Sequence, residues 1–219
     1  MRNILIVAGG IVAVAAIVTG VYMGSRPSTP GQPPVAVAAT PDKAALLTVQ
    51  AGDHVMGDPK AAVTLIEYAS FTCPHCASFH LQVLPEIKKK WIDTGKVKLI
   101  YRDFPLDQTA LKAAQLAECS AKDRYFAVID MIFRSQSVWA ASGNAIGELS
   151  RSLRVAGLGE EEAKACLAND AVANRVLADY RGGEVLGVTS TPTLFIDGQM
   201  YRGDRSVAEF DAAIGRLVK

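Results

Sequence analysis

The sequence lacks an excess of charge of either sign. Its 219 residues include 23 Lys and Arg and 22 Asp and Glu, which gives a formal net charge of +1. The two signs are interspersed, so the chain has neither the basic stripe that binds nucleic acid nor an acidic tail. We therefore predict that the protein does not bind nucleic acid and that bulk charge does not select its partners.

Cysteine and histidine are also scarce, with four Cys and three His. Cys73 and Cys76 form one C-x-x-C motif, but the second C-x-x-C or H-x-x-H of a structural zinc site does not follow it. We predict no metal and no other cofactor. One alternative stays open, a non-catalytic metal-binding or chaperone module that uses the pair with His80 as a third ligand.

The segment Cys73-Pro74-His75-Cys76 lies between a strand-like apolar run and an amphipathic helix. At the helix N-terminus, free backbone N–H groups and the helix dipole favour a thiolate, so the pKa of Cys73 should fall. Pro74 loses no hydrogen bond as the first helical residue, and a protonated His75 would add positive charge. Cys76, one turn later, should be less exposed. The spacing predicts a disulfide that opens and closes by thiol-disulfide exchange.

The chain begins with an apolar run as long as the ~20 residues that a membrane-spanning helix needs. We interpret residues 1–24 as a signal anchor. A cleaved signal peptide is the alternative, because small residues at 36–38 form a candidate cleavage site. Residues 26–41 contain five prolines and therefore should form neither a helix nor a packed strand, so we predict a linker over residues 25–47. The remaining residues, 48–219, are enough for one domain.

In that domain, strand-like and helix-like patterns of apolar residues alternate. Their order is βαβ followed by ββα, with a helical stretch between them over residues 107–187. This order predicts an α/β fold with a mixed sheet. The predicted strands cover residues 62–69, 97–104, 193–196 and 200–202. The predicted flanking helices cover residues 74–92, kinked at Pro85, and residues 207–217, with Ser206 as the N-cap.

Two motifs and the helical stretch between them carry a resemblance to a known family. Residues 67–76 read E-Y-A-S-F-T-C-P-H-C, and residues 188–198 read V-T-S-T-P-T-L-F-I-D-G. Over residues 52–219 the chain resembles the thioredoxin superfamily, and specifically the DsbA-like thiol-disulfide oxidoreductases of bacterial cell envelopes. The resemblance implies a thioredoxin-like fold in which residues 107–187 form an inserted helical subdomain.

The resemblance also implies further site residues. Pro192 would be a cis-proline beside the cysteine pair, and the backbone of Thr191 would pair with an extended substrate. Glu67 would be a buried acid that relays a proton to or from Cys76, although a solvated strand end is the alternative. The Thr191 hydroxyl could bond the Cys73 sulfur, and threonine here also occurs in isomerase-like relatives, so the redox potential stays open.

Four cysteines permit three pairings, and joining the nearest neighbours leaves Cys119 with Cys166. DsbA-like proteins of alphaproteobacteria are similar in having a second disulfide in the helical subdomain. The resemblance therefore implies that Cys119 and Cys166 form a structural disulfide. Two buried free thiols are the alternative.

The function implied by the resemblance is that of a dithiol oxidase. Such a protein donates the Cys73–Cys76 disulfide to reduced, partly unfolded secreted proteins in the periplasm. A quinone-coupled membrane protein resembling DsbB would reoxidise it, and the N-terminal helix would tether a monomer to the membrane. A reductase or a disulfide isomerase of the same fold is the alternative.

Overall fold

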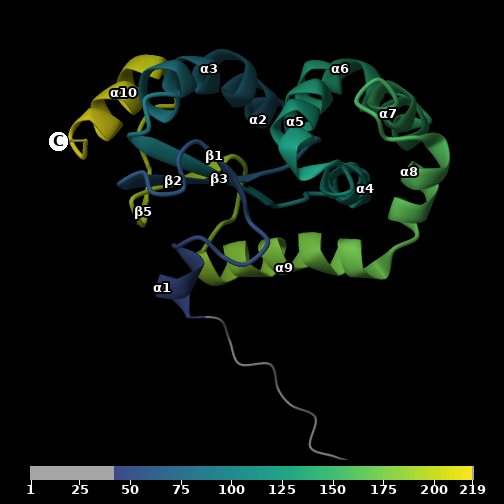
Figure 1. Ribbon diagram of the computed structural model, residues 1–219, viewed down its shortest axis with the longest axis horizontal. Helices are drawn as coiled ribbons and strands as arrows, with labels where there is room; N and C mark the ends of the chain where they lie inside the picture. The colour runs from purple at the N-terminus through teal and green to yellow at the C-terminus, as the bar shows by residue number, and fades with distance from the viewer. Residues whose placement is uncertain (1–41, 219) are drawn as a thin grey trace, which may run out of the picture. The chain divides into compact units, whose positions relative to one another are not determined.

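The computed structural model describes residues 42–218 of the chain (Figure 1). The predicted anchor or signal peptide at residues 1–24 lies outside the described residues, as do residues 25–41 of the predicted linker. Within residues 42–218, no helix has both the length and the apolar character that a membrane crossing requires.

One mixed sheet lies at the middle of the described chain. Its strands are β1 (His54–Met56), β2 (Val63–Ala69), β3 (Val97–Asp103), β4 (Thr193–Ile196) and β5 (Gln199–Met200). They are arranged in the order β1-β3-β2-β4-β5, with β2 parallel to β3 and antiparallel to β4. Side chains on both faces of β2 and β3 are buried, so helices must cover both faces of the sheet. The predicted α/β fold with a mixed sheet is confirmed, and β2 lies at the centre of the sheet.

The two edge strands depart from the sequence prediction. β1 was not predicted, because it has three half-buried residues and no clear alternation. β5 covers residues 199–200 instead of the predicted 200–202. Edge strands pair on one side alone, so short segments with weak patterns suffice to form them.

One face of the sheet is covered by α2 (Pro74–Ser78), α3 (Leu84–Ile87) and α10 (Val207–Gly215), which lie above it in Figure 1. Leu65 of β2 and Phe210 of α10 belong to the same buried cluster and are almost fully inaccessible. The cluster holds the helix that follows the cysteine motif against the sheet.

The other face is covered by α9 (Asp170–Leu186), which lies below the sheet in Figure 1. Gly183 permits this close approach, because a Cβ at this position would lie 2.8 Å from the ring of Phe104 and 3.0 Å from that of Tyr68. The contact explains why a residue with low helix propensity stands inside a long helix.

The helix after the cysteine motif runs from Pro74 to Ile92, over the predicted range, but it is not regular. The turns Phe79–Val83 (η1) and Lys88–Ile92 (η2) are π-helical, before and after α3. Pro85 stands near the start of α3. Because proline has no N–H and crowds the preceding turn, the expected kink takes the form of the wider π-helical turn before it.

Between β3 and β4 the regular structure is helical. After β3 come α4 (Gln108–Glu118), η3 (Lys122–Arg124), α5 (Tyr125–Arg134), α6 (Gln136–Trp139), α7 (Ala145–Leu153) and α8 (Glu160–Leu167), followed by α9. Their apolar sides form a buried cluster of their own, which includes Ile132 and Trp139. This cluster also contains Phe71 and both cysteines of the motif, so the helical stretch packs directly against the redox pair.

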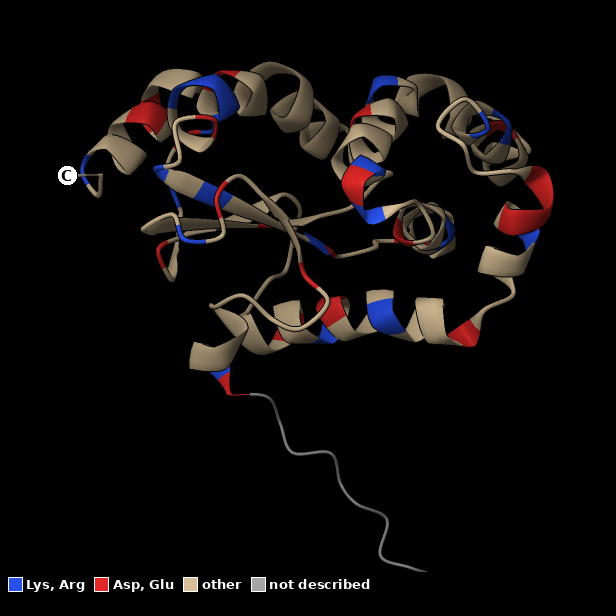
Figure 2. Cartoon of the chain, viewed as in Figure 1, with Lys and Arg blue, Asp and Glu red and all other residues tan. Residues whose placement is uncertain are grey.

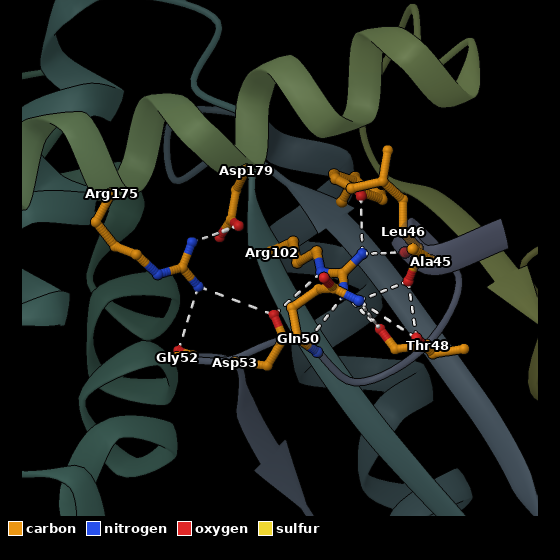
Figure 3. A network of polar contacts seen from close by, with 10 residues as sticks. Ala45, Leu46, Thr48, Gln50, Gly52, Asp53, Arg102, Arg175 and Asp179 are labelled. Atoms are coloured by element: carbon orange, nitrogen blue, oxygen red, sulfur yellow. Dashed lines mark hydrogen bonds and ion pairs between the residues drawn. The ribbon is translucent and has the colours of Figure 1, made fainter. Parts of the chain in front are cut away.

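A buried arginine fixes residues 46–53 to the sheet (Figure 3). Arg102 of β3 is 2% exposed and pairs with the carboxylate of Asp53 at 2.8 Å. It also donates to the backbone carbonyls of Leu46 and Thr48, the latter at 2.8 Å. A buried guanidinium is tolerated when its N–H groups are bonded and its charge is paired. This segment therefore belongs to the folded domain. The short helix α1 (Lys43–Leu46), which the sequence placed in the linker, precedes it and contacts α9.

Candidate active site

The cysteine motif begins immediately after the loop that leaves β2. Cys73 is the N-cap residue of α2 with an extended backbone (φ −83°, ψ 117°), and Pro74 stands at the start of the helix. Cys73 is 6% exposed and Cys76 is fully buried; both carry free thiols, so the structure represents the reduced form. The cysteine with solvent access is thus the one at the helix N-terminus.

The two thiols have opposite acidities. The pKa of Cys73 is lowered to about 5, mainly by a hydrogen bond from the side chain of Cys76. Burial opposes this shift, and the Thr191 side chain and the backbone N–H groups of Cys76 and His75 reinforce it. His75 therefore acts on the Cys73 sulfur through its backbone N–H, as expected for a group at a helix N-terminus.

Cys76 has a strongly raised pKa, and burial is the main cause. Its hydrogen bond to Cys73 and the negative charge of Glu67 raise it further. The backbone N–H of Ser70 donates to the Cys76 sulfur at 3.5 Å and lowers its pKa, but this effect is smaller. Cys73 is therefore a thiolate at neutral pH and Cys76 is a thiol.

The loop before β4 brings Thr191 and Pro192 to the cysteines, although 118 residues separate Thr191 from Cys73. The Thr191–Pro192 peptide bond is cis, and the Cys73 thiol donates to the Thr191 carbonyl at 3.3 Å. The Thr191 hydroxyl is buried and makes no hydrogen bond within the described residues while Cys73 is protonated. It lowers the pKa of Cys73 because it can donate to the thiolate.

Glu67 lies in the middle of the sheet and is fully buried, which contradicts the alternative of a solvated strand end. Its Oε2 is 2.8 Å from Nε2 of His80. Its other oxygen, Oε1, has no hydrogen-bond partner among residues 42–218. His80, considered from the sequence as a third metal ligand, pairs with this carboxylate instead. In the described part of the chain, no three His, Cys, Asp or Glu side chains are grouped so that they could hold a metal ion.

Sequence reasoning missed Gln136 of α6. Its side-chain amide is buried and donates to the carbonyls of Phe71 at 2.7 Å and Cys73 at 3.0 Å. The carbonyls on both sides of Thr72 are therefore bonded by a residue of the helical stretch. The sequence carries no signal for this contact, because Gln136 stands 63 residues after Cys73 and shares no pattern with the motif.

Cys119 and Cys166 are joined by a disulfide. Cys119 is the C-cap residue of α4, and Cys166 lies in the last turn of α8. The bond links two helices of the stretch between β3 and β4.

Comparisons with known proteins agree with this geometry. Residues 49–216 match the family model described as "Thioredoxin".

The chain belongs to the thioredoxin family.

Within that family it is DsbA-like. It is similar in structure to alpha-DsbA1 of Wolbachia pipientis, with a TM-score of 0.73, 34% identity, and coverage of 80% of this chain and 96% of that one. It is also similar to a protein-disulfide isomerase from Novosphingobium aromaticivorans, with a TM-score of 0.66, 26% identity, and coverage of 77% and 98%.

A sequence relative from Rickettsia conorii carries the provisional name of a protein-disulfide oxidoreductase. It is 32% identical over 176 residues, which is 78% of this chain. The match spans 62% of the Rickettsia conorii protein, so more than a third of that relative has no counterpart in the comparison.

Proposed function

We propose that this member of the thioredoxin family is a thiol-disulfide oxidoreductase that donates its Cys73–Cys76 disulfide to reduced proteins. The observation that carries the proposal is the opposite acidity of the two thiols. The pKa of Cys73 is lowered to about 5 whereas that of Cys76 is raised. A stabilised thiolate favours the reduced enzyme, and a protein that holds its reduced form well is a strong oxidant.

The reaction begins with the oxidised enzyme. A substrate thiolate attacks the Cys73 sulfur, which forms a substrate–Cys73 disulfide and releases the sulfur of Cys76. A second substrate thiolate then attacks the substrate sulfur of that mixed disulfide. The products are an oxidised substrate, the Cys73 thiolate and the Cys76 thiol, so two electrons pass from the substrate to the enzyme.

The surroundings of Cys73 support a protein substrate. α2 carries no Lys, Arg, Asp or Glu, as Figure 2 shows. The backbone carbonyl of Thr191, just before the cis Pro192, lies 3.3 Å from the Cys73 sulfur. An extended substrate could pair with this backbone while its thiol meets Cys73. Main-chain pairing is independent of side chains, so it fits clients of varied sequence.

The cellular setting forms part of the proposal. We propose that the protein works in the periplasm on partly unfolded secreted proteins, because disulfides form and persist in oxidising compartments. The apolar run at residues 1–24 would anchor or export it. A DsbB-like, quinone-coupled membrane protein would reoxidise the cysteines, and a tether would raise the effective concentration of that partner. The protein would act as a monomer.

The redox potential of Cys73–Cys76 tests the proposal. Purified protein equilibrated in glutathione buffers should show a potential well above the ~−270 mV of thioredoxin, toward the ~−120 mV of DsbA. A value near that of thioredoxin would overturn the oxidase and favour a reductase.

A second measurement separates the oxidase from an isomerase, which the similarity to the Novosphingobium protein brings into question. An oxidase should restore activity to reduced, unfolded ribonuclease in proportion to the amount of enzyme that carries the Cys73–Cys76 disulfide. An isomerase would instead restore activity to ribonuclease with scrambled disulfides while it is in the reduced form.

A further inference from the structure

Arg205 lies in the loop between β5 and α10 and contacts the loop that carries the cis-proline. Its Nη2 donates to the carbonyl oxygen of Pro192 at 3.0 Å. The carbonyl of Thr191, the residue before Pro192, is 3.3 Å from the Cys73 sulfur. The Arg205 guanidinium therefore lies beside the stretch of backbone with which an extended substrate would pair while its thiol meets Cys73.

The charge of Arg205 is available to a ligand. The residue is exposed, and none of the ion pairs formed within residues 42–218 includes it. A guanidinium carries several N–H donors in a planar fork, and the contact with Pro192 uses one of its two terminal nitrogens. The rest of the fork matches a carboxylate, which a guanidinium binds through two parallel hydrogen bonds.

The loop around Arg205 is anchored on both sides. Before it, the hydroxyl of Tyr201 donates to the carbonyl of Asp204 at 2.7 Å, and the Tyr201 ring packs on Phe210 of α10 at 4.4 Å between centroids. After it, the N–H of Ser206 donates to Oδ1 of Asp204 at 3.1 Å, and Ser206 caps α10. The guanidinium is thus presented from a fixed backbone, which reduces the entropy lost when a ligand binds it.

The other charges close to the cysteine motif are arranged differently. Asp107, the N-cap residue of α4, has both carboxylate oxygens engaged: Oδ2 accepts from the hydroxyl of Thr72 at 2.6 Å, and Oδ1 accepts from the N–H of Ala110 at 2.7 Å. These bonds serve the fold around Cys73. Arg205, in contrast, adds a cation beside the substrate-pairing backbone with donors left over.

We propose that Arg205 selects substrates that carry Asp or Glu close to the reacting cysteine, by pairing with that carboxylate while it stays bonded to Pro192. The inference rests on the proposed function and names a class of substrate for it. An extended chain advances ~3.3 Å per residue, so a carboxylate two or three residues from the cysteine lies about 7 to 10 Å along the strand. Because Arg205 occupies one place beside this strand, the preference applies on one side of the cysteine. It is a bias added to main-chain pairing, since an exposed ion pair changes affinity by at most about fivefold.

The test uses the reduced full chain and peptides whose single cysteine is joined to thionitrobenzoate. The Cys73 thiolate attacks the peptide sulfur, which forms a peptide–Cys73 disulfide and releases coloured thionitrobenzoate, the thiolate of lower pKa. Cys76 then attacks Cys73, which closes the enzyme disulfide and releases the peptide thiol. The peptides differ by one residue, Asp, Asn or Lys, placed two positions before or after the cysteine. Each rate is divided by the rate with free glutathione, which removes the effect of the charge on the peptide disulfide itself.

The half-saturating concentration should be about threefold lower for the Asp peptide than for the Asn peptide, and higher again for the Lys peptide. This order should hold for one of the two placements and should weaken in high salt. The saturating rate should be the same for all three, because the ion pair acts equally on the bound peptide and on the transition state. Equal half-saturating concentrations in both placements would overturn the proposal.

Charge variants assign the preference to Arg205. Arg205→Glu should reverse the order of the peptides, and Arg205→Lys should keep it because the positive charge remains. The matched control is Arg202→Glu, which makes the same change of charge at an exposed position of the same loop and should keep the wild-type order. Reversal by Arg202→Glu as well would mean that the general charge of this surface acts, and it would overturn the role of Arg205. An Arg205→Glu protein that is slower with all peptides alike would show that Arg205 supports the cis-proline loop and selects nothing.

The outcomes also separate this inference from the proposed function. The peptide assay starts from the reduced protein and does not depend on its redox potential. A wild-type protein that oxidises reduced ribonuclease but treats the three peptides alike would keep its function and lose the selection. A wild-type protein that prefers the Asp peptide but has the potential of thioredoxin would keep the selection and lose the oxidase assignment.

Discussion

The chain holds two cysteine pairs whose surroundings differ at every level. Cys73 and Cys76 are separated by three positions at the N-terminus of α2 and are thiols in this structure. Cys119 and Cys166 are separated by 47 positions and are joined. Cys119 ends α4 and Cys166 lies in the last turn of α8. Cys73 and Cys76 therefore lie at the N-terminus of a helix, where backbone N–H groups are free. Cys119 and Cys166 lie at the C-termini of two helices, where backbone carbonyls are free.

Helix polarity gives the two cysteine pairs different chemical roles. The N–H groups and the positive end of the dipole stabilise a thiolate, which makes Cys73 a good leaving group in exchange. The carbonyl ends of α4 and α8 disfavour a thiolate, so the second disulfide has no comparably stabilised sulfur to release. We conclude that the Cys73–Cys76 disulfide is suited to repeated thiol-disulfide exchange and that the Cys119–Cys166 disulfide is suited to a structural role.

The largest expected effect comes from removing the reactive sulfur. Cys73→Ser should abolish disulfide transfer to reduced ribonuclease, because Cys73 is the sulfur that the loop at Thr191 presents. The matched change in the other pair, Cys119→Ala with Cys166→Ala, should leave transfer within the range of the wild type. Transfer by Cys73→Ser would contradict the assignment of the two pairs.

Of the two cysteine pairs, Cys119 and Cys166 should contribute more to the stability of the folded protein. Removing the Cys119–Cys166 bond should lower the free energy of unfolding by about 3 to 4 kcal/mol, from the entropy of closing its loop in the unfolded chain. Guanidinium denaturation of the double alanine variant against the wild type, both with Cys73 and Cys76 reduced, measures this difference. A loss below about 1 kcal/mol would mean that the bond does not restrain the unfolded chain.

Gln136 of α6 links the helical stretch between β3 and β4 to the loop that carries Cys73. Its loss should lower stability less than loss of the Cys119–Cys166 disulfide. Gln136→Leu leaves the buried carbonyl of Phe71 without a donor, which should cost about 2 kcal/mol of stability. The Cys73 carbonyl also loses the amide, but it keeps the backbone N–H groups of Cys76 and Ala77 as donors. Denaturation reports the stability, and hydrogen exchange should show faster opening at the start of α2. Gln108→Leu, at an exposed position on α4, is the control and should change neither.

The smallest expected effect is on the acidity of Cys73. In the wild type, thiolate absorbance at 240 nm should be lost as the pH falls through about 5, the pKa of Cys73. Thr191→Val removes a group that lowers this pKa, so absorbance should be lost at a higher pH. Cys76→Ala removes the largest cause and should shift the loss further upward. The opposite order would show that the hydroxyl, and not the Cys76 thiol, controls the acidity.

Much of the fold could be predicted because its signals are local. Val63–Ala69 is rich in apolar and β-branched residues, Pro74 marks a helix start, and the Ser206 side chain caps α10 as expected. The π-helical turns around α3 were not predicted, because a hydrophobic pattern fixes which face is buried and not the hydrogen-bonding step.

The candidate site was predictable where residues are neighbours in the sequence and not where the fold brings them together. A lowered pKa of Cys73 could be predicted because its main cause, the Cys76 side chain, and the backbone N–H groups at the start of α2 are neighbours in the sequence. The contacts of Gln136 with the motif depend on where α6 packs, and the partner of His80 depends on the burial of β2. Such pairings follow from three-dimensional packing, and no spacing encodes them.

The sequence by itself determined the chemistry of this protein, since a cysteine pair at the start of a helix and a helix-forming stretch are local properties of the chain. The tertiary structure decided how that chemistry is controlled. It placed Thr191 against Cys73, buried Glu67 with His80, and joined Cys119 to Cys166. The physical reason is that acidity and proton access depend on desolvation and on partners that meet only after the chain has folded.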